Sequence, residues 1–397
     1  MLQEDKEGQE RYRVTRTYSR TVVACLTVTR DPGMEHHEWP PLVPVIQHQP
    51  QHGHHDQGAA TMGNQSGALH HLGRQTYLLG PDARFKFELV FNLVLTFSFS
   101  ATGVLTNSIN IAVFARQGLS ETANINFLAL SLSDLVIVAW FLAKALCENP
   151  LLVHASPLFL TLRDFFLLTL PVYHAAQGFG AWVTALITVE RTVCIVYPLR
   201  VKTIFTPARV SAALALVLLF ELASLAPPYS SMQLVWVVSA GSNLTKLRHA
   251  DQHGQHGALS YLVFYTAPSL AAFTVVTLGT AILVVKLRQS VRRRQEMTHK
   301  SGQEVAQKEV KVAQSVVLVC VMFVVCYSPC VYVIVKGALD PDFHFGDPYY
   351  EHFVFSYLSV TFFLQSVSSS MNMFVYIKLS SRYKQTFRQV FCAAKPA

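Results

Sequence analysis

Charged residues are scarce in this sequence, and their scarcity excludes an ordinary soluble globule. Aspartate, glutamate, lysine and arginine make up 14% of the 397 residues, whereas hydrophobic residues make up 51%. Soluble domains carry about 25% charged residues, and the mean hydropathy here is +0.31. The formal net charge of +8 does not indicate nucleic acid, because the basic residues lie between long apolar segments. The composition therefore predicts a protein of the lipid bilayer with no nucleic-acid partner.

Cysteine is scarce as well. The seven cysteines are too few and too scattered for a disulfide scaffold. Most lie within or beside apolar segments or near the C-terminus, namely Cys194, Cys320, Cys326, Cys330 and Cys392. Cys25 and Cys147 face the oxidising side, so a bridge between these two stays open, because connectivity cannot be read from sequence.

Two other classes of membrane protein lack their usual features. The sequence shows no metal cluster and no nucleophile beside a base, so an enzyme is not expected. Transporters often contain inverted repeats or paired broken helices, and neither is evident. Because Asp134, Glu221 and Lys144 are intramembrane charges, a multi-span transporter or ion channel that uses these three residues remains the alternative.

Long apolar segments are what the sequence does contain. About twenty apolar residues cross a bilayer as a helix. Seven segments of about that length are present: Phe87–Ala115, Asn126–Leu146, Phe165–Ile195, Val210–Pro228, Leu259–Val285, Val312–Val335 and Phe353–Ile377. The sequence predicts an all-α membrane protein built as a seven-transmembrane-helix bundle.

The basic residues set the expected orientation. They gather after the third segment, between the fifth and sixth, and after the seventh, and loops rich in lysine and arginine lie in the cytoplasm. The N-terminus is therefore expected outside a plasma-membrane protein. Glycosylation sequons at Asn64 and Asn243 fall on the same outer side.

Three parts of the chain are expected. Residues 1–84 are polar and rich in histidine, which predicts a disordered extracellular tail, within which Met34 and Met62 are alternative starts. Residues 85–392 form the membrane domain, and 393–397 a short cytoplasmic tail. Before that tail, Tyr383, Phe387 and Phe391 recur at helical spacing, which predicts an amphipathic helix on the inner lipid surface. Cys392 is either a palmitoylation site or a free thiol.

Polar residues inside the segments form the first candidate site. Asp134 in the second segment needs a partner, a cation or a proton. Asn107 in the first segment and Ser368, Ser369 and Asn372 in the seventh are candidates to complete a polar pocket. Such a pocket could hold a sodium ion or a proton, and the plainer reading is interhelical hydrogen bonding.

Two prolines form a second candidate device. Pro268 and Pro329 each remove a backbone donor and bend their helices. Phe323 and Tyr327 lie below Pro329 at helical spacing, so the kinked helix with its aromatic pair is a candidate lever. Core packing explains the same residues equally well.

Arg191, at the inner end of the third segment, is the third candidate. An arginine cannot lose its proton and is costly in hydrocarbon. Snorkelling to the interface is the alternative explanation.

These motifs together resemble the rhodopsin-like family of G-protein-coupled receptors. The resemblance rests on Asn107, Leu130-x3-Asp134, Glu190-Arg191-Thr192 with Pro198, Pro268, Phe323-x2-Cys326-Tyr327-Ser328-Pro329 and Asn372-Met373-x2-Tyr376. It covers about residues 87–392. Some strings, such as 201–207, are similar to molluscan chemosensory-type and invertebrate neuropeptide receptors.

The resemblance implies roles for these residues. Arg191 would be held by Glu190 and by Glu309 until an extracellular ligand favours the state with this pair broken. Arg191, Asn372 and Tyr376 would then act on a heterotrimeric G protein, and arrestin and a receptor kinase are further implied partners.

The sequence also departs from that family. Tyr327 replaces the usual Trp and Met373 the usual Pro, and the cysteine pair of the outer disulfide is missing. Ser366 stands where opsins carry the retinal lysine, so no retinal is expected. The outer half offers ligand-binding candidates of mixed chemistry: Lys144, Tyr173, His174, Gln177, Tyr327 and Gln365. Lys144 suits an acidic ligand, whereas the acidic last outer loop suits a basic peptide, and the sequence does not decide between them.

Overall fold

The computed structural model describes residues 78–149, 152, 162, 166–197, 199–238, 245–251, 262–296, 303–340, 343 and 349–391. Of some residues within these ranges, such as 303–312, it describes the backbone alone. The expected tail at 1–84, the sequons at Asn64 and Asn243, and Cys25 and Cys392 therefore lie wholly or almost wholly outside the described residues.

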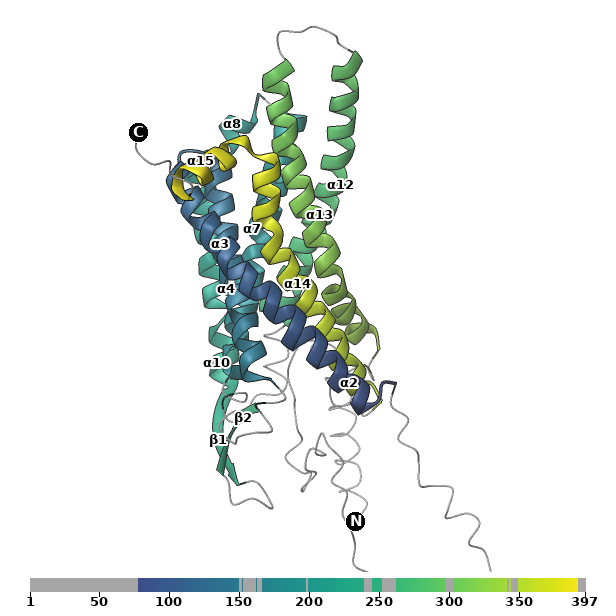
Figure 1. Cartoon of the computed structure of the whole chain (residues 1–397). Coiled ribbons are helices and arrows are strands. Elements are labelled where there is room, and N and C mark those ends of the chain that lie inside the picture. Colours follow the sequence, from purple (N-terminus) through teal and green to yellow (C-terminus); the bar gives the residue numbers. More distant parts are fainter. Residues whose placement is uncertain are drawn as a thin grey trace, which may run out of the picture.

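Seven long helical segments form one bundle (Figure 1). The first is continuous through α2 (Pro81–Phe87), the π-helical η2 (Glu88–Thr96) and α3 (Phe97–Gln117). The others are α4 (Thr122–Cys147), α7 (Leu170–Val196) after the 3-10 turn η3 (Leu167–Thr169), α9 (Pro207–Ala223), α12 (Ala267–Glu296) after the π-helical η4 (Leu262–Thr266), α13 (Gln303–Leu339) and α14 (Glu351–Leu379). The predicted bundle is confirmed, and the helices extend beyond most predicted bounds.

Six of these helices are long and apolar enough to cross a membrane by length and composition: Pro81–Gln117, Thr122–Cys147, Leu170–Val196, Pro207–Ser230, Leu262–Gln289 and Ala313–Gly337. The seventh, α14, has 29 residues and packs against α13 and α3. It carries many serines and other polar residues on its buried side, which lowers its hydropathy without removing it from the bundle.

Local sequence explains several helix ends. Pro171 and Pro207 stand in the first turns of α7 and α9, where a missing N–H costs nothing. The Thr206 hydroxyl caps α9 by accepting from the Arg209 backbone N–H. Gly118 ends α3 at φ +83°, a left-handed value that favours glycine. The chain can therefore turn sharply from α3 into α4.

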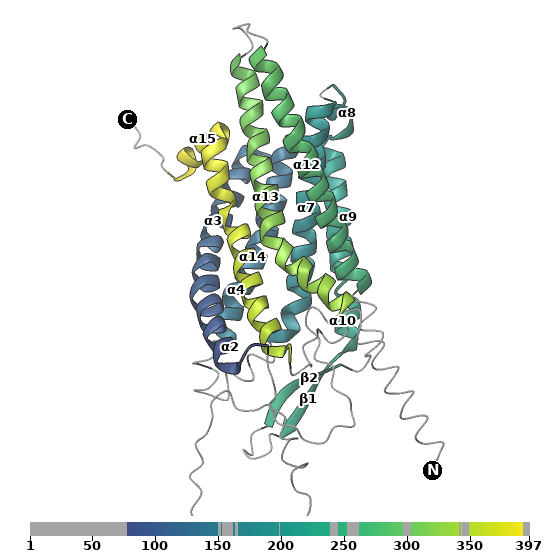
Figure 2. The same ribbon diagram turned by 90° about the vertical axis from the view of Figure 1, so that its right-hand side faces the viewer.

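The two ends of the bundle differ (Figure 2). At one end α12 and α13 project past the other helices, and the short α8 (Val201–Ile204) and α15 (Ser381–Phe391) lie nearby. At the other end α10 (Ala226–Ser231) leads into an antiparallel hairpin of β1 (Met232–Val238) and β2 (Thr245–Asp251), with Met232 opposite Asp251 and Val238 opposite Thr245. This hairpin is the departure from an all-helical chain within the described residues.

The two larger buried apolar clusters lie toward opposite ends of the bundle, and a third, smaller one contains Tyr327 and Cys330. One includes Val113, Leu130, Val316 and Tyr376 and lies toward the end that carries α15. The other joins Trp140, Phe141 and Tyr173 to Phe362 near the opposite end. Polar side chains lie between them, and they form the candidate site.

Candidate functional site

Arg191 lies near the C-terminal end of α7, beside the buried carboxylate of Glu190. Its Nη2 is 3.8 Å from Glu190 Oε1. Glu190 also accepts hydrogen bonds from the Thr122 hydroxyl at 2.6 Å and from Asn126 Nδ2 at 2.7 Å. Arg191 Nε is buried without a hydrogen-bond partner among the described residues. The Glu190 carboxylate thus connects Arg191 to α4. Sequence reasoning missed the two contacts of Glu190 with Thr122 and Asn126.

Glu309 lies on α13, but its side chain is outside the described residues. The predicted contact between Glu309 and Arg191 therefore stays a prediction.

Tyr376 on α14 is buried among aromatic rings. Its ring centroid lies 4.9 Å from that of Phe127, 5.3 Å from that of Phe114 and 5.6 Å from that of Tyr383. Its hydroxyl has no hydrogen-bond partner among the described residues. Because an unpaired buried hydroxyl is costly, this tyrosine gains a hydrogen bond if it moves to a polar partner.

Tyr383 of α15 adds a hydrogen bond that the sequence did not suggest. Its hydroxyl donates to Asn110 Oδ1 at 2.5 Å. The predicted amphipathic helix is thereby fastened to α3 through a buried side chain. Burial raises the pKa of the Tyr383 phenol above its ordinary value, so this phenol stays a donor at physiological pH.

The structure brings the predicted ion-pocket residues together. Asn372 Nδ2 donates to Asp134 Oδ2 at 2.7 Å, and Ser369 is a further hydrogen-bonding neighbour of Asp134. Asn107 Nδ2 donates to the Ser369 carbonyl at 2.8 Å. Four predicted positions on three helices thus share one polar network. The donor set, a carboxylate with hydroxyls nearby, suits a small hard cation, and sodium binding remains a prediction.

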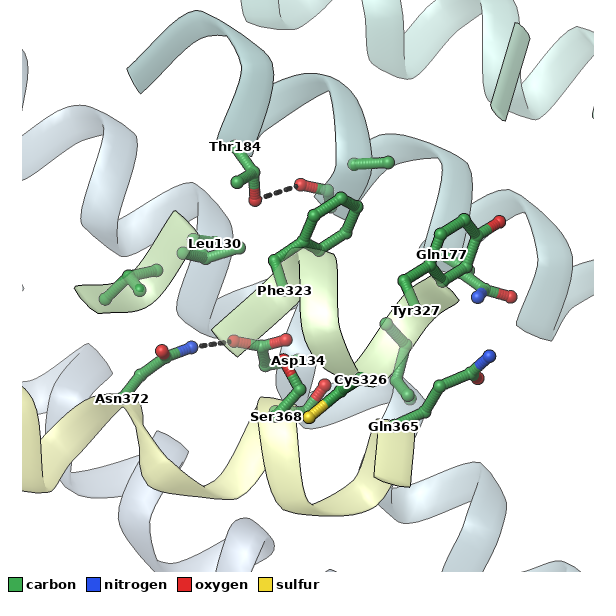
Figure 3. A pocket seen from close by; sticks show the side chains of 15 residues that line it. Leu130, Asp134, Gln177, Thr184, Phe323, Cys326, Tyr327, Gln365, Ser368 and Asn372 are labelled. Carbon is green, nitrogen blue, oxygen red and sulfur yellow. Dashed lines mark hydrogen bonds between the residues drawn. The ribbon is translucent and has the colours of Figure 1, made fainter. Parts of the chain in front are cut away.

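A cavity of about 50 Å³ lies over this network, between α4, α7, α13 and α14 (Figure 3). One water molecule needs about 10–15 Å³ by this measure, so the cavity has room for a few water molecules. Ser368 lines it together with Asp134, Gln177, Tyr327 and Gln365. A second cavity of about 30 Å³ shares Gln177 and Tyr327 with the first and is also lined by Tyr173 and His174.

The candidate lever lines the same space. The rings of Phe323 and Tyr327 stack at 5.3 Å with an interplanar angle of 15°, and Phe273 of α12 lies 5.7 Å from Tyr327. Pro329 lies inside α13. Pro268 is the second residue of α12, directly after the π-helical η4. A proline and a π-helical segment each interrupt regular α-helical hydrogen bonding. Their role in transmission stays a prediction.

Tyr173 and Gln365, which each line one of the two cavities, join α7 to α14. The Tyr173 hydroxyl donates to Gln365 Oε1. The Tyr173 ring stacks on Trp140 of α4 at 4.4 Å, and Trp140 Nε1 donates to the Thr169 hydroxyl at 2.9 Å. Sequence reasoning missed Trp140 and Thr169. They fasten α4 to the N-terminal end of α7.

Two other ligand-binding candidates, Lys144 and His174, contact other side chains of the protein. Lys144 forms an ion pair with Glu148 one turn along α4, and its ammonium lies 5.3 Å from the Phe362 ring centroid. It lines neither cavity. His174 faces Tyr265 at a ring distance of 5.7 Å.

Glu221 lies in the apolar helix α9. Its position in the sequence allows two readings, a protonated acid that faces lipid or an acid that contacts a partner helix. Its side chain is in fact 2% exposed, and its Oε1 lies 2.5 Å from the point that a Cβ on Gly178 of α7 would occupy. The lipid-facing reading is therefore wrong. The absence of a side chain at Gly178 creates the space that admits the carboxyl group.

Comparison with known proteins agrees with this arrangement. A family model described as 7 transmembrane receptor (rhodopsin family) matches residues 106–376. The chain is also similar to galanin receptor 2b of Danio rerio, at 24% identity over 327 residues, which are 81% of this chain and 79% of the relative. The matched span includes every switch, transmission and cavity residue described above, and the chain belongs to the rhodopsin family of seven-transmembrane receptors.

Proposed function

We propose that this receptor converts the binding of an extracellular peptide into activation of a heterotrimeric G protein. The observation that carries the proposal is the pairing of Arg191 with a buried, triply engaged Glu190 at one end of the bundle. A ligand that binds the opposite end better in one state shifts the population toward that state. Breaking this pair would free Arg191 for a G-protein helix.

The proposed orientation places the α15 end in the cytoplasm and the hairpin end outside the plasma membrane. The α15 end also carries α8, which contains Lys202, and the projecting part of α12, which contains the basic residues 286–294. This distribution agrees with the positive-inside rule. Arrestin and a receptor kinase are proposed as further partners at that end.

A peptide ligand is favoured over the chemosensory small molecule by the relative that the chain resembles. That relative is named as a receptor for galanin, and the long β1–β2 hairpin offers a broad outer surface. The chemosensory alternative stays a prediction.

The transporter alternative has less support. Asp134 faces Asn372, Lys144 pairs with Glu148, and Glu221 packs on α7. Of these three charged residues only Asp134 lines a described cavity, so they do not mark one path.

The test is a peptide screen with G-protein activation as the readout. Cells that express the full chain at the surface are exposed to neuropeptides that include galanin, and nucleotide exchange on each G-protein class is measured. Activation by a peptide supports the proposal. Ion movement across the membrane without coupling to any G protein contradicts it.

A further inference from the structure

Gln365 presents a buried hydrogen-bond donor to the cavity. The residue is 7% exposed, and its Oε1 already accepts from the Tyr173 hydroxyl. Its Nε2 has no partner among the described residues. An unpaired buried donor is costly, so an acceptor that reaches Nε2 recovers free energy that the protein alone does not recover.

The amide is held in a defined direction. The Tyr173 ring, which fixes Oε1, is itself stacked on Trp140, and Trp140 is anchored by its hydrogen bond to Thr169. Figure 3 shows the Gln365 amide pointing toward the Gln177 amide across the outer part of the cavity. A donor that is fixed before binding gains affinity, because little rotamer freedom is lost on binding.

The surroundings favour a neutral partner. Among the described residues that line the two cavities, Asp134 is the one acidic residue, and lysine and arginine do not occur. Asp134 is engaged by Asn372, which follows Gln365 by seven residues, or about 10 Å along a helix. An unpaired charge beside Gln365 would lose its hydration without gaining an opposite charge.

We propose that the outer part of this cavity is a subsite for an uncharged carbonyl group, whose oxygen accepts a hydrogen bond from Gln365 Nε2. A backbone or side-chain amide of a peptide carries such a group. The inference rests on the proposed function, since the carbonyl would belong to the activating peptide. It excludes a ligand that enters this subsite with an ammonium or a carboxylate.

Four small probes of similar size separate the alternatives: acetone, acetamide, acetate and ethylammonium. Binding of each to the purified full-length receptor is measured by ligand-observed NMR and by the shift in thermal unfolding temperature. We expect saturable binding of acetone and acetamide only. Preferential binding of acetate or ethylammonium, or saturable binding of none of the four, would overturn the proposal.

Two variants identify the donor. Gln365→Met and Tyr173→Phe both remove the hydrogen bond between these residues, but only the first removes the amide. Gln365→Met is expected to weaken acetamide binding about tenfold, the usual value of one hydrogen bond to a buried donor. Tyr173→Phe should weaken it less, because it affects only the position of the amide. Equal affinity of Gln365→Met and the unsubstituted receptor contradicts the assignment.

The probe experiment needs no G protein, so the two proposals fail separately. Neutral probes that bind through Gln365, together with a lack of activation by any peptide, would remove the proposed function and keep the subsite. Peptide activation with Gln365-independent probe binding would do the reverse.

Discussion

Replacing Glu190 with glutamine tests the proposed latch with little steric change. Glu190→Gln keeps the oxygen that accepts from Thr122. Asn126 can turn its amide, because its Oδ1 is buried without a partner and can accept from the new amide. The substitution therefore removes mainly the negative charge beside Arg191.

The size of the effect follows from the distance and the burial. At 3.8 Å, opposite charges attract by about 4 kcal/mol at an effective dielectric constant of about 20. The Arg191 side chain is 17% exposed, and both groups lose hydration, so we take the net value to be about 1–2 kcal/mol. Such a value changes a two-state ratio about 5- to 30-fold. A receptor that is about 1% active without ligand would become about 5–23% active.

The assay is ligand-independent nucleotide exchange on the G protein, in membranes with matched surface expression. Glu121→Gln is the control, since Glu121 pairs with Arg382 but both side chains are about half exposed, and exposed pairs contribute little. We expect Glu190→Gln to raise the basal activity above that of the unsubstituted receptor and Glu121→Gln to leave it unchanged. Basal activity of Glu190→Gln at or below the unsubstituted level would refute the reasoning.

Three further predictions concern other contacts. Glu309→Ala should raise ligand-independent signalling, and an unchanged basal signal at equal surface expression would remove Glu309 from the latch. Gly178→Ala places a methyl group against the Glu221 carboxyl and should lower stability by about 1–3 kcal/mol, which thermal unfolding of the purified receptor measures. If the double variant Gly178→Ala, Glu221→Ala does not regain the lost stability, the loss has another cause. Tyr383→Phe leaves Asn110 Oδ1 without its donor and should lower the free energy of unfolding by about 1–2 kcal/mol in the same assay. An unchanged unfolding temperature would contradict this prediction.

The sequence predicted the bundle well because the relevant signals are local. Each apolar segment is long enough to identify a helix by itself. Phe323 and Tyr327 stack because residues four apart share one helix face. The contact between Asp134 and Asn372 was also expected, since a buried carboxylate requires polar neighbours and few segments supply them.

The missed contacts depend on the packing of distant segments. Trp140 donates to Thr169, and Tyr383 to Asn110, and no local pattern marks either pair. Glu221 lies on a helix with apolar residues on every side, so its sequence has no polar face that would show which way the carboxyl group points. Only the missing side chain at Gly178, seen in three dimensions, settles that direction.

The ladder of polar residues on α14 joins the proposed subsite to the proposed switch. Gln365, Ser369, Asn372 and Tyr376 are spaced four, three and four residues apart and are all buried, so they lie on one helix face. Gln365 accepts a hydrogen bond from Tyr173, and Asn372 donates one to Asp134. A ligand carbonyl that accepts from Gln365 Nε2 would act on the same helix that carries Tyr376. The Tyr376 hydroxyl has no partner among the residues that the structure describes, so a shift of α14 that brought it to a polar group would add a hydrogen bond. We therefore predict that the proposed subsite and the proposed switch are coupled through α14, so that a substitution at Asp134 changes the ligand-dependent part of G-protein activation, measured as nucleotide exchange.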